Sequence, residues 1–132
     1  MPTTPKKPVI LIADDRASSR ELLRTVLQRA DYAVLEAEDG EQALEQARSG
    51  HPDLILLDLQ MPGLDGFGVL AELRADPQFK NLPILALTAS AMRGDREKIL
   101  AAGFTEYLAK PAGPDALRET VARLLRSASS QS

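Results

Sequence analysis

The stretch that most constrains the fold of this chain runs from Asp53 to Gly66 and reads DLILLDLQMPGLDG. It opens with an unbroken apolar run from Leu54 to Leu57, a pattern typical of a strand that is buried on both faces of a parallel sheet. The run ends on the carboxylate of Asp58, and turn-forming proline and glycine residues follow at once. Open α/β sheets bind their ligands in the crevice outside the carboxyl ends of the strands. The sequence therefore predicts that Asp58 lies at a functional site.

Four other segments have the apolar character of buried strands, and helical patterns separate them. The expected strands are Val9–Ala13, Tyr32–Ala37, Leu82–Leu87 and Phe104–Ala109. After each strand, apolar residues recur at a spacing of three and four, which predicts an amphipathic helix. The expected helices comprise one that opens with a Ser18–Glu21 capping box, one that Gly50 stops, one that Asp76–Pro77 stops, and two over residues 93–102 and 115–126.

Five strands that alternate with five helices through short connections predict an α/β fold with helices on both faces of a parallel sheet. For a chain of 132 residues the economical choice is the flavodoxin-like, doubly wound (βα)5 fold with strand order 2-1-3-4-5. We expect one domain over residues 9–126, a disordered leader over residues 1–8 and a flexible tail over residues 127–132.

Composition excludes several classes of function. The net charge of -3 offers no basic footprint for nucleic acid, and the absence of cysteine excludes disulfides and thiolate metal sites. No apolar run approaches the roughly 20 residues that a membrane span needs, and the first residues do not resemble a signal peptide. We therefore expect a cytoplasmic protein without a membrane span.

Polar side chains follow four of the five expected strands. Asp14 and Asp15 follow the first strand, Asp58 the third, Thr88 the fourth and Lys110 the fifth. Because the first and third strands are neighbours in the 2-1-3-4-5 order, the three aspartates are expected to share one crevice. Three close carboxylates repel one another unless a cation compensates their charge. Oxygen ligands without histidine or cysteine suit a hard cation, and an open site suits Mg²⁺.

This set of groups is chemically complete for the capture of a phosphoryl group. An aspartate beside a metal can act as a nucleophile toward phosphorus and form an aspartyl phosphate. The ammonium group of Lys110 would contact one phosphoryl oxygen and offset its negative charge, and the Thr88 hydroxyl would donate a hydrogen bond to another.

Four motifs, in order along the chain, resemble those of the receiver domain of two-component response regulators. They are ADD at residues 13–15, LLDLQMPGLDG at residues 56–66, LTASA at residues 87–91 and YLAKP at residues 107–111. The resemblance covers about Val9 to Leu125, which is nearly the whole chain. Each motif alone is weak, but the four together at these separations are specific.

The resemblance implies a phosphoacceptor and a metal site. Asp58 would accept a phosphoryl group from a sensor histidine kinase or a histidine phosphotransfer protein. Asp15 and Asp58 would bind Mg²⁺ directly, Gln60 through its backbone carbonyl and Asp14 through water, and Mn²⁺ is a possible substitute for Mg²⁺.

The resemblance also implies a switch. Thr88 would move toward the phosphorylated site, Tyr107 would turn inward, and Lys110 would contact the phosphate, with a cis Lys110–Pro111 peptide bond. The face formed by the fourth helix, fifth strand and fifth helix would then bind a downstream protein target.

The chain resembles stand-alone response regulators of the chemotaxis or cell-polarity type, as a monomer or a phosphorylation-dependent dimer. Such a domain is not an enzyme beyond assisting its own phosphorylation and dephosphorylation. Gln60 and Ser90 would tune the lifetime of the phosphate, and Arg16 would alter metal affinity. The sequence leaves open the cognate kinase, the target, and the choice between an output and a relay role.

Three alternatives use related scaffolds. A phosphatase with an aspartate nucleophile needs a second aspartate two residues later, where this chain has Gln60, and usually a cap domain. A flavin-binding module would have a Ser/Thr/Gly-rich phosphate loop in place of Asp14 and Asp15. A phosphate-independent interaction domain remains possible, although such degenerate receivers typically lose an acidic residue or the lysine, and this chain has both.

Overall fold

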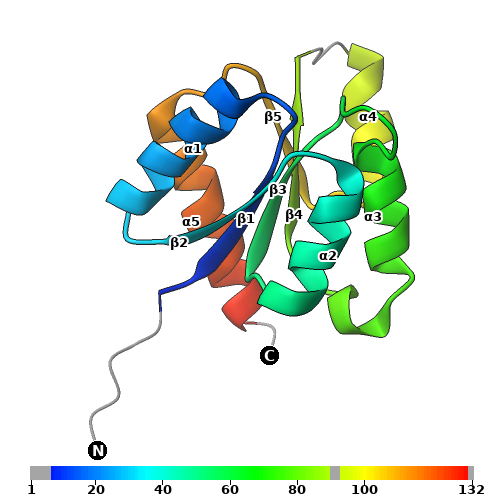
Figure 1. Cartoon of the computed structure of the whole chain (residues 1–132), viewed down its shortest axis with the longest axis horizontal. Coiled ribbons are helices and arrows are strands. Elements are labelled where there is room, and N and C mark those ends of the chain that lie inside the picture. The colour runs from blue at the N-terminus through cyan, green and yellow to red at the C-terminus, as the bar shows by residue number, and fades with distance from the viewer. Residues whose placement is uncertain (1–6, 90–92, 131–132) are drawn as a thin grey trace, which may run out of the picture.

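The computed structural model describes residues 7–89 and 93–130, which form a five-stranded parallel sheet covered by helices on both faces (Figure 1). The strand order is β2-β1-β3-β4-β5. The strands are β1 (Val9–Ala13), β2 (Ala33–Ala37), β3 (Leu54–Asp58), β4 (Ile84–Thr88) and β5 (Glu106–Ala109). The predicted flavodoxin-like fold with strand order 2-1-3-4-5 is confirmed.

Two layers of helices cover the sheet. Helices α1 and α5 lie on one face, and α2, α3 and α4 lie on the other (Figure 1). The helices are α1 (Ala17–Arg29), α2 (Gly40–Gly50), α3 (Gly66–Arg74), α4 (Arg93–Ala102) and α5 (Pro114–Ser130), with a short 3₁₀ helix, η1 (Pro77–Phe79), before β4. None of the helices in the described part of the chain has the length and apolar character to cross a membrane.

Strand β3 lies at the centre of the sheet and is buried along its whole length. Ile55 and Leu57 pack in the cluster under α2, α3 and α4, whereas Leu54 and Leu56 pack in the cluster under α1 and α5. The continuous apolar run follows from this position, because alternate side chains of a strand point to opposite faces and here both faces are covered.

The ends of several strands differ from the prediction. Asp58 is the last residue of β3 rather than the residue after it, and β2 begins at Ala33 rather than Tyr32. Strand β4 begins at Ile84, two residues later than predicted, because Pro83 has no N–H for the ladder. Strand β5 begins at Glu106, where its pairing with Leu85 of β4 starts, rather than at Phe104.

The predicted capping box of α1 is wrong. The helix begins at Ala17, and its cap residue Arg16 makes no side-chain capping bond. The carboxylate of Asp14 lies just before the helix and accepts the N–H of Arg16 and the hydroxyl of Ser19. Ser18 is already inside the helix and exposed. A side chain from the preceding loop therefore takes the place of a cap.

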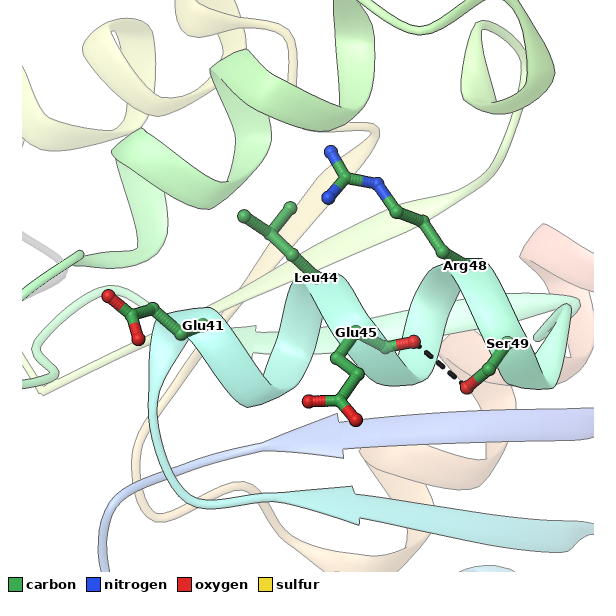
Figure 2. A pocket seen from close by; sticks show the side chains of 5 residues that line it. All are labelled: Glu41, Leu44, Glu45, Arg48 and Ser49. Carbon is green, nitrogen blue, oxygen red and sulfur yellow. Dashed lines mark hydrogen bonds between the residues drawn. The ribbon is translucent and has the colours of Figure 1, made fainter.

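The prediction for the end of α2 is also corrected. Gly50 is the last helical residue, and the left-handed position falls on exposed His51, with a φ of 47°. Gly50 packs closely against β2 instead: a Cβ atom there would lie 2.4 Å from Cδ1 of Leu35, so a larger residue would require the Leu35 side chain to shift. The hydroxyl of Ser49 donates to the Glu45 carbonyl oxygen in this last turn, at 2.9 Å (Figure 2).

The other helix limits agree more closely. Helix α4 spans the predicted residues, and α3 ends at Arg74, just before the predicted stop at Asp76–Pro77. Helix α5 continues to Ser130, four residues beyond the predicted limit at Arg126. Residues 1–6 of the expected leader and residues 131–132 of the expected tail lie outside the described residues.

Candidate functional site

The carboxyl ends of β1 and β3 bring three aspartates together. Asp58 ends β3, and Asp14 and Asp15 follow β1, which pairs with β3 through Ala13 and Leu57. Each of the three side chains offers a carboxylate oxygen, and these three atoms lie within 4.8 Å of one another. The clustering of three aspartates expected from the strand order is therefore present.

The three carboxylates differ sharply in exposure. Asp14 is completely buried and Asp58 is 4% exposed, whereas Asp15 is open to solvent. Burial of an ionised carboxylate is costly unless charged partners or hydrogen-bond donors compensate it. The two buried side chains must therefore be compensated from within the protein.

Lys110, which follows β5, supplies that compensation. Its Nζ atom lies 2.8 Å from Oδ2 of Asp14 and 3.1 Å from Oδ2 of Asp58. Its main-chain N–H donates to the carbonyl oxygen of Thr88 at 2.8 Å, which fixes the start of the β5–α5 loop against the end of β4. One ammonium thus bridges two buried carboxylates across the sheet edge.

Asp14 has further donors from the start of α1. Its Oδ1 atom accepts the N–H of Arg16 at 2.9 Å, and Oδ2 accepts the hydroxyl of Ser19 at 2.6 Å. Its main-chain oxygen accepts Nη1 of Arg20 at 2.7 Å. Among the residues that the structure describes, Asp58 has one such donor besides Lys110, because its Oδ1 atom accepts the N–H of Gln60 at 3.1 Å.

These partners displace the pKa values in opposite directions. Burial raises the pKa of Asp58, and the Gln60 N–H and Lys110 offset it only in part. Burial acts in the same sense on Asp14, but donors from Lys110, Ser19 and Arg16 outweigh it and lower its pKa. Burial alone would lower the pKa of Lys110, whereas its bonds to both carboxylates raise it above the ordinary value. Lys110 is therefore held as a cation.

A hollow on the surface of α2 contains none of these groups. It is lined by Glu41, Leu44, Glu45, Arg48 and Ser49, all from one helix (Figure 2). Its charged side chains are the ordinary polar surface of an amphipathic helix. The chemistry of this chain is concentrated at the carboxyl edge of the sheet.

The sequence model of the response regulator receiver domain matches residues 10–122, which is most of the chain. The chain belongs to this receiver domain family.

Two curated relatives match this chain over most of its length. The chain is 42% identical over 121 residues to the probable transcriptional regulator ycf27 of Porphyridium aerugineum, covering 92% of this chain and 49% of that protein. It is 34% identical over 119 residues to the polar-differentiation response regulator DivK of Brucella ovis, covering 90% of this chain and 97% of DivK. The chain thus spans about half of the first relative and nearly all of the second.

A solved receiver domain has the same fold. It is the receiver domain of the sensor histidine kinase PA1611 from Pseudomonas aeruginosa PAO1, with a magnesium ion coordinated in its active site cleft. The TM-score is 0.85 with 36% sequence identity, over 92% of this chain and 99% of that one.

Thr88 and Tyr107 lie on the neighbouring strands β4 and β5. Thr88 ends β4 and is 4% exposed, and Tyr107 in β5 is half-buried against the cluster under α2, α3 and α4. The Lys110–Pro111 peptide bond is cis. The movements expected of Thr88 and Tyr107 stay predictions. Ser90, expected to tune the phosphate lifetime, lies outside the described residues.

Sequence reasoning missed two contacts of this receiver site. Ser19 was not considered, although it lies five residues after Asp14 and faces it from the first turns of α1. Arg20 was likewise missed, and Arg16 contacts Asp14 through its main-chain N–H. A serine and an arginine near the start of a helix are common on solvated surfaces, so the sequence contains no signal that singles them out.

Proposed function

We propose that this domain is a phosphorylation-activated switch in which Asp58 accepts a phosphoryl group from a phosphohistidine of a sensor kinase or phosphotransfer protein. The observation that carries the proposal is the bridge from Lys110 Nζ to Asp14 and Asp58, beside the exposed carboxylate of Asp15. Family membership supports the same reading.

In the proposed reaction a carboxylate oxygen of Asp58 attacks phosphorus. The new O–P bond forms as the N–P bond of the phosphohistidine breaks, and the imidazole nitrogen leaves with the electron pair of that bond. Lys110 contacts an oxygen of Asp58 before the reaction, so its charge is available to a phosphoryl oxygen afterwards. The Thr88 hydroxyl would donate to another phosphoryl oxygen.

The donor set fits Mg²⁺. All the side-chain ligands are carboxylates, and one of the three is exposed, which suits a hard cation that keeps several waters. Asp15 and Asp58 would bind the ion directly, Gln60 through its main-chain carbonyl and Asp14 through water. Bound Mg²⁺ supplies positive charge to the phosphoryl oxygens. The magnesium ion in the cleft of the Pseudomonas receiver domain supports this assignment.

The switch would act through β4 and β5. Thr88 and Tyr107 lie on adjacent strands near the same edge, since Thr88 pairs with Ala109 and Ala86 with Tyr107. Movement of Thr88 toward a phosphorylated Asp58 would let Tyr107 turn further into the core. The face of α4, β5 and α5 would then change shape and bind a downstream protein.

The proposed partners are therefore a phosphohistidine donor and a protein target, in the cytoplasm, with the domain acting as a monomer or as a phosphorylation-dependent dimer. The domain would promote only its own phosphorylation and dephosphorylation.

A chelator experiment tests the metal assignment. We expect intact-mass spectra to show one phosphoryl addition after incubation with phosphoramidate and Mg²⁺, and almost none after excess EDTA, because the buried carboxylates then repel the donor. Restoring Mg²⁺ or adding Mn²⁺ should restore labelling. Equal labelling in EDTA would refute the roles of Asp15 and Gln60 as ligands.

A further inference from the structure

Ser19 lies near the start of α1, and its hydroxyl takes one of the acceptor sites of the Asp14 carboxylate. The half-buried Ser19 donates to Oδ2 at 2.6 Å, and Lys110 donates to the same oxygen at 2.8 Å. The N–H of Arg16 donates to Oδ1 at 2.9 Å. A carboxylate has about four lone-pair sites. Among the described residues these three donors leave Asp14 with one acceptor site, and it belongs to Oδ1.

The main chain at Asp14 is also held in place. Nη1 of Arg20 donates to its carbonyl oxygen at 2.7 Å, and Nε of the same guanidinium lies 3.4 Å from Glu36 of β2. Arg20 itself is largely buried between α1 and β2, with 15% of its side chain exposed. Because this bridge fixes the backbone, the acceptor sites left on Asp14 depend mainly on the donors around its side chain.

We propose that Ser19 is a positioning residue that limits the contribution of Asp14 to cation binding. Its hydroxyl and Lys110 keep both acceptor sites of Oδ2 occupied, so Oδ1 is left as the acceptor for a metal-bound water. The inference rests on the proposed divalent-cation site at Asp14, Asp15 and Asp58.

Loss of the Ser19 hydroxyl has a definite sign. One acceptor site on Oδ2 becomes free, so Asp14 can accept a second hydrogen bond from metal-bound water or contact the cation through this oxygen. This change strengthens Asp14 as a cation ligand. If Ser19 only maintained the shape of the loop, its loss would loosen the site and weaken binding.

The test is Mn²⁺ binding to the unphosphorylated chain, followed by electron paramagnetic resonance of the free ion. We expect Ser19→Ala to lower the Mn²⁺ dissociation constant about fivefold, the ratio that corresponds to one hydrogen bond of ordinary net strength. Ser19→Thr retains the hydroxyl and should stay within about twofold of the wild type. Ser18→Ala is the matched control, since exposed Ser18 makes no side-chain hydrogen bond in the described part of the chain.

The outcomes separate this inference from the proposed function. Unchanged or weaker binding by Ser19→Ala overturns the inference and leaves the metal site intact. Equally tight binding by Ser19→Thr and Ser19→Ala also overturns it, because the hydroxyl would then be irrelevant. A wild-type chain that binds no Mn²⁺ overturns the cation site itself.

Discussion

Two half-buried cations, at opposite edges of the sheet, have entirely different partners. Lys110 lies at the carboxyl edge and bridges the carboxylates of Asp14 and Asp58. Arg74 ends α3 at the amino edge, and the carbonyl oxygens of Phe79, Lys80, Leu82 and Gly103 and the hydroxyl of Thr105 accept its guanidinium protons.

The difference in partners separates a reactive group from a structural one. Burial lowers the pKa of Arg74, whereas the two carboxylates raise the pKa of Lys110 despite its burial. The partners of Lys110 can bind a metal or accept a phosphoryl group, so its contacts can be exchanged during a reaction. The carbonyl partners of Arg74 cannot accept a phosphoryl group, and its contacts connect α3 with η1, the segment before β4 and the turn after α4.

The largest expected effect on stability is at Arg74. We expect Arg74→Met to lower the free energy of unfolding by about 2–4 kcal/mol, because several partly buried carbonyl oxygens lose their donor. Urea titration followed by circular dichroism measures this change. Arg74→Lys retains the charge without the planar fork, so it should recover less than half of the loss.

Phosphorylation sharpens the test at Arg74. The folded fraction of Arg74→Met should still be labelled by phosphoramidate at a rate close to that of the wild type. A stable Arg74→Met variant that cannot be labelled would contradict the division between the two cations.

Lys110→Arg should show the reverse pattern. The charge is preserved, so we expect the free energy of unfolding to change by less than about 1 kcal/mol. The guanidinium cannot reproduce the compact ammonium between two carboxylates, and labelling should slow by about tenfold or more. Wild-type labelling kinetics in this variant would remove Lys110 from the reaction.

The smallest expected effect is a gain in stability at the carboxyl edge. Burial disfavours the ionised form of Asp58 and raises its pKa, so an uncharged side chain of the same shape should be tolerated better in the folded state. We expect Asp58→Asn to raise the free energy of unfolding by about 0.5–1 kcal/mol near neutral pH. A clear loss in the same urea titration would mean that the bond to Lys110 outweighs burial.

The contacts of Lys110 could be predicted from the sequence, whereas those of Arg74 could not. Lys110 and Asp58 stand at the ends of apolar runs, and the order of parallel strands is enough to bring such positions together. The contacts of Arg74 are mostly to main-chain oxygens, which every residue has, so no pattern of residue types identifies them. Its partners lie between 5 and 31 residues away along the chain.

The errors at helix ends have a similar cause. The Ser18–Glu21 pattern is local, but α1 begins against Asp14, a side chain held in place by Lys110 from the far end of the chain. The fit of Gly50 against Leu35 likewise depends on how α2 packs on β2. The fold could be predicted because periodicity and burial repeat along the chain, whereas single tertiary contacts do not.

The most direct test of the central claim uses the two ends of β3. Asp53 precedes the strand and Asp58 ends it, and Asp53 is exposed, with its carboxylate bound to the N–H of Val9. Wild type, Asp58→Asn and the control Asp53→Asn are incubated with phosphoramidate and Mg²⁺, and their intact masses are measured. We predict one base-labile phosphoryl group on the wild type and on Asp53→Asn, and none on Asp58→Asn. Persistent labelling of folded Asp58→Asn would contradict the assignment of Asp58 as the acceptor.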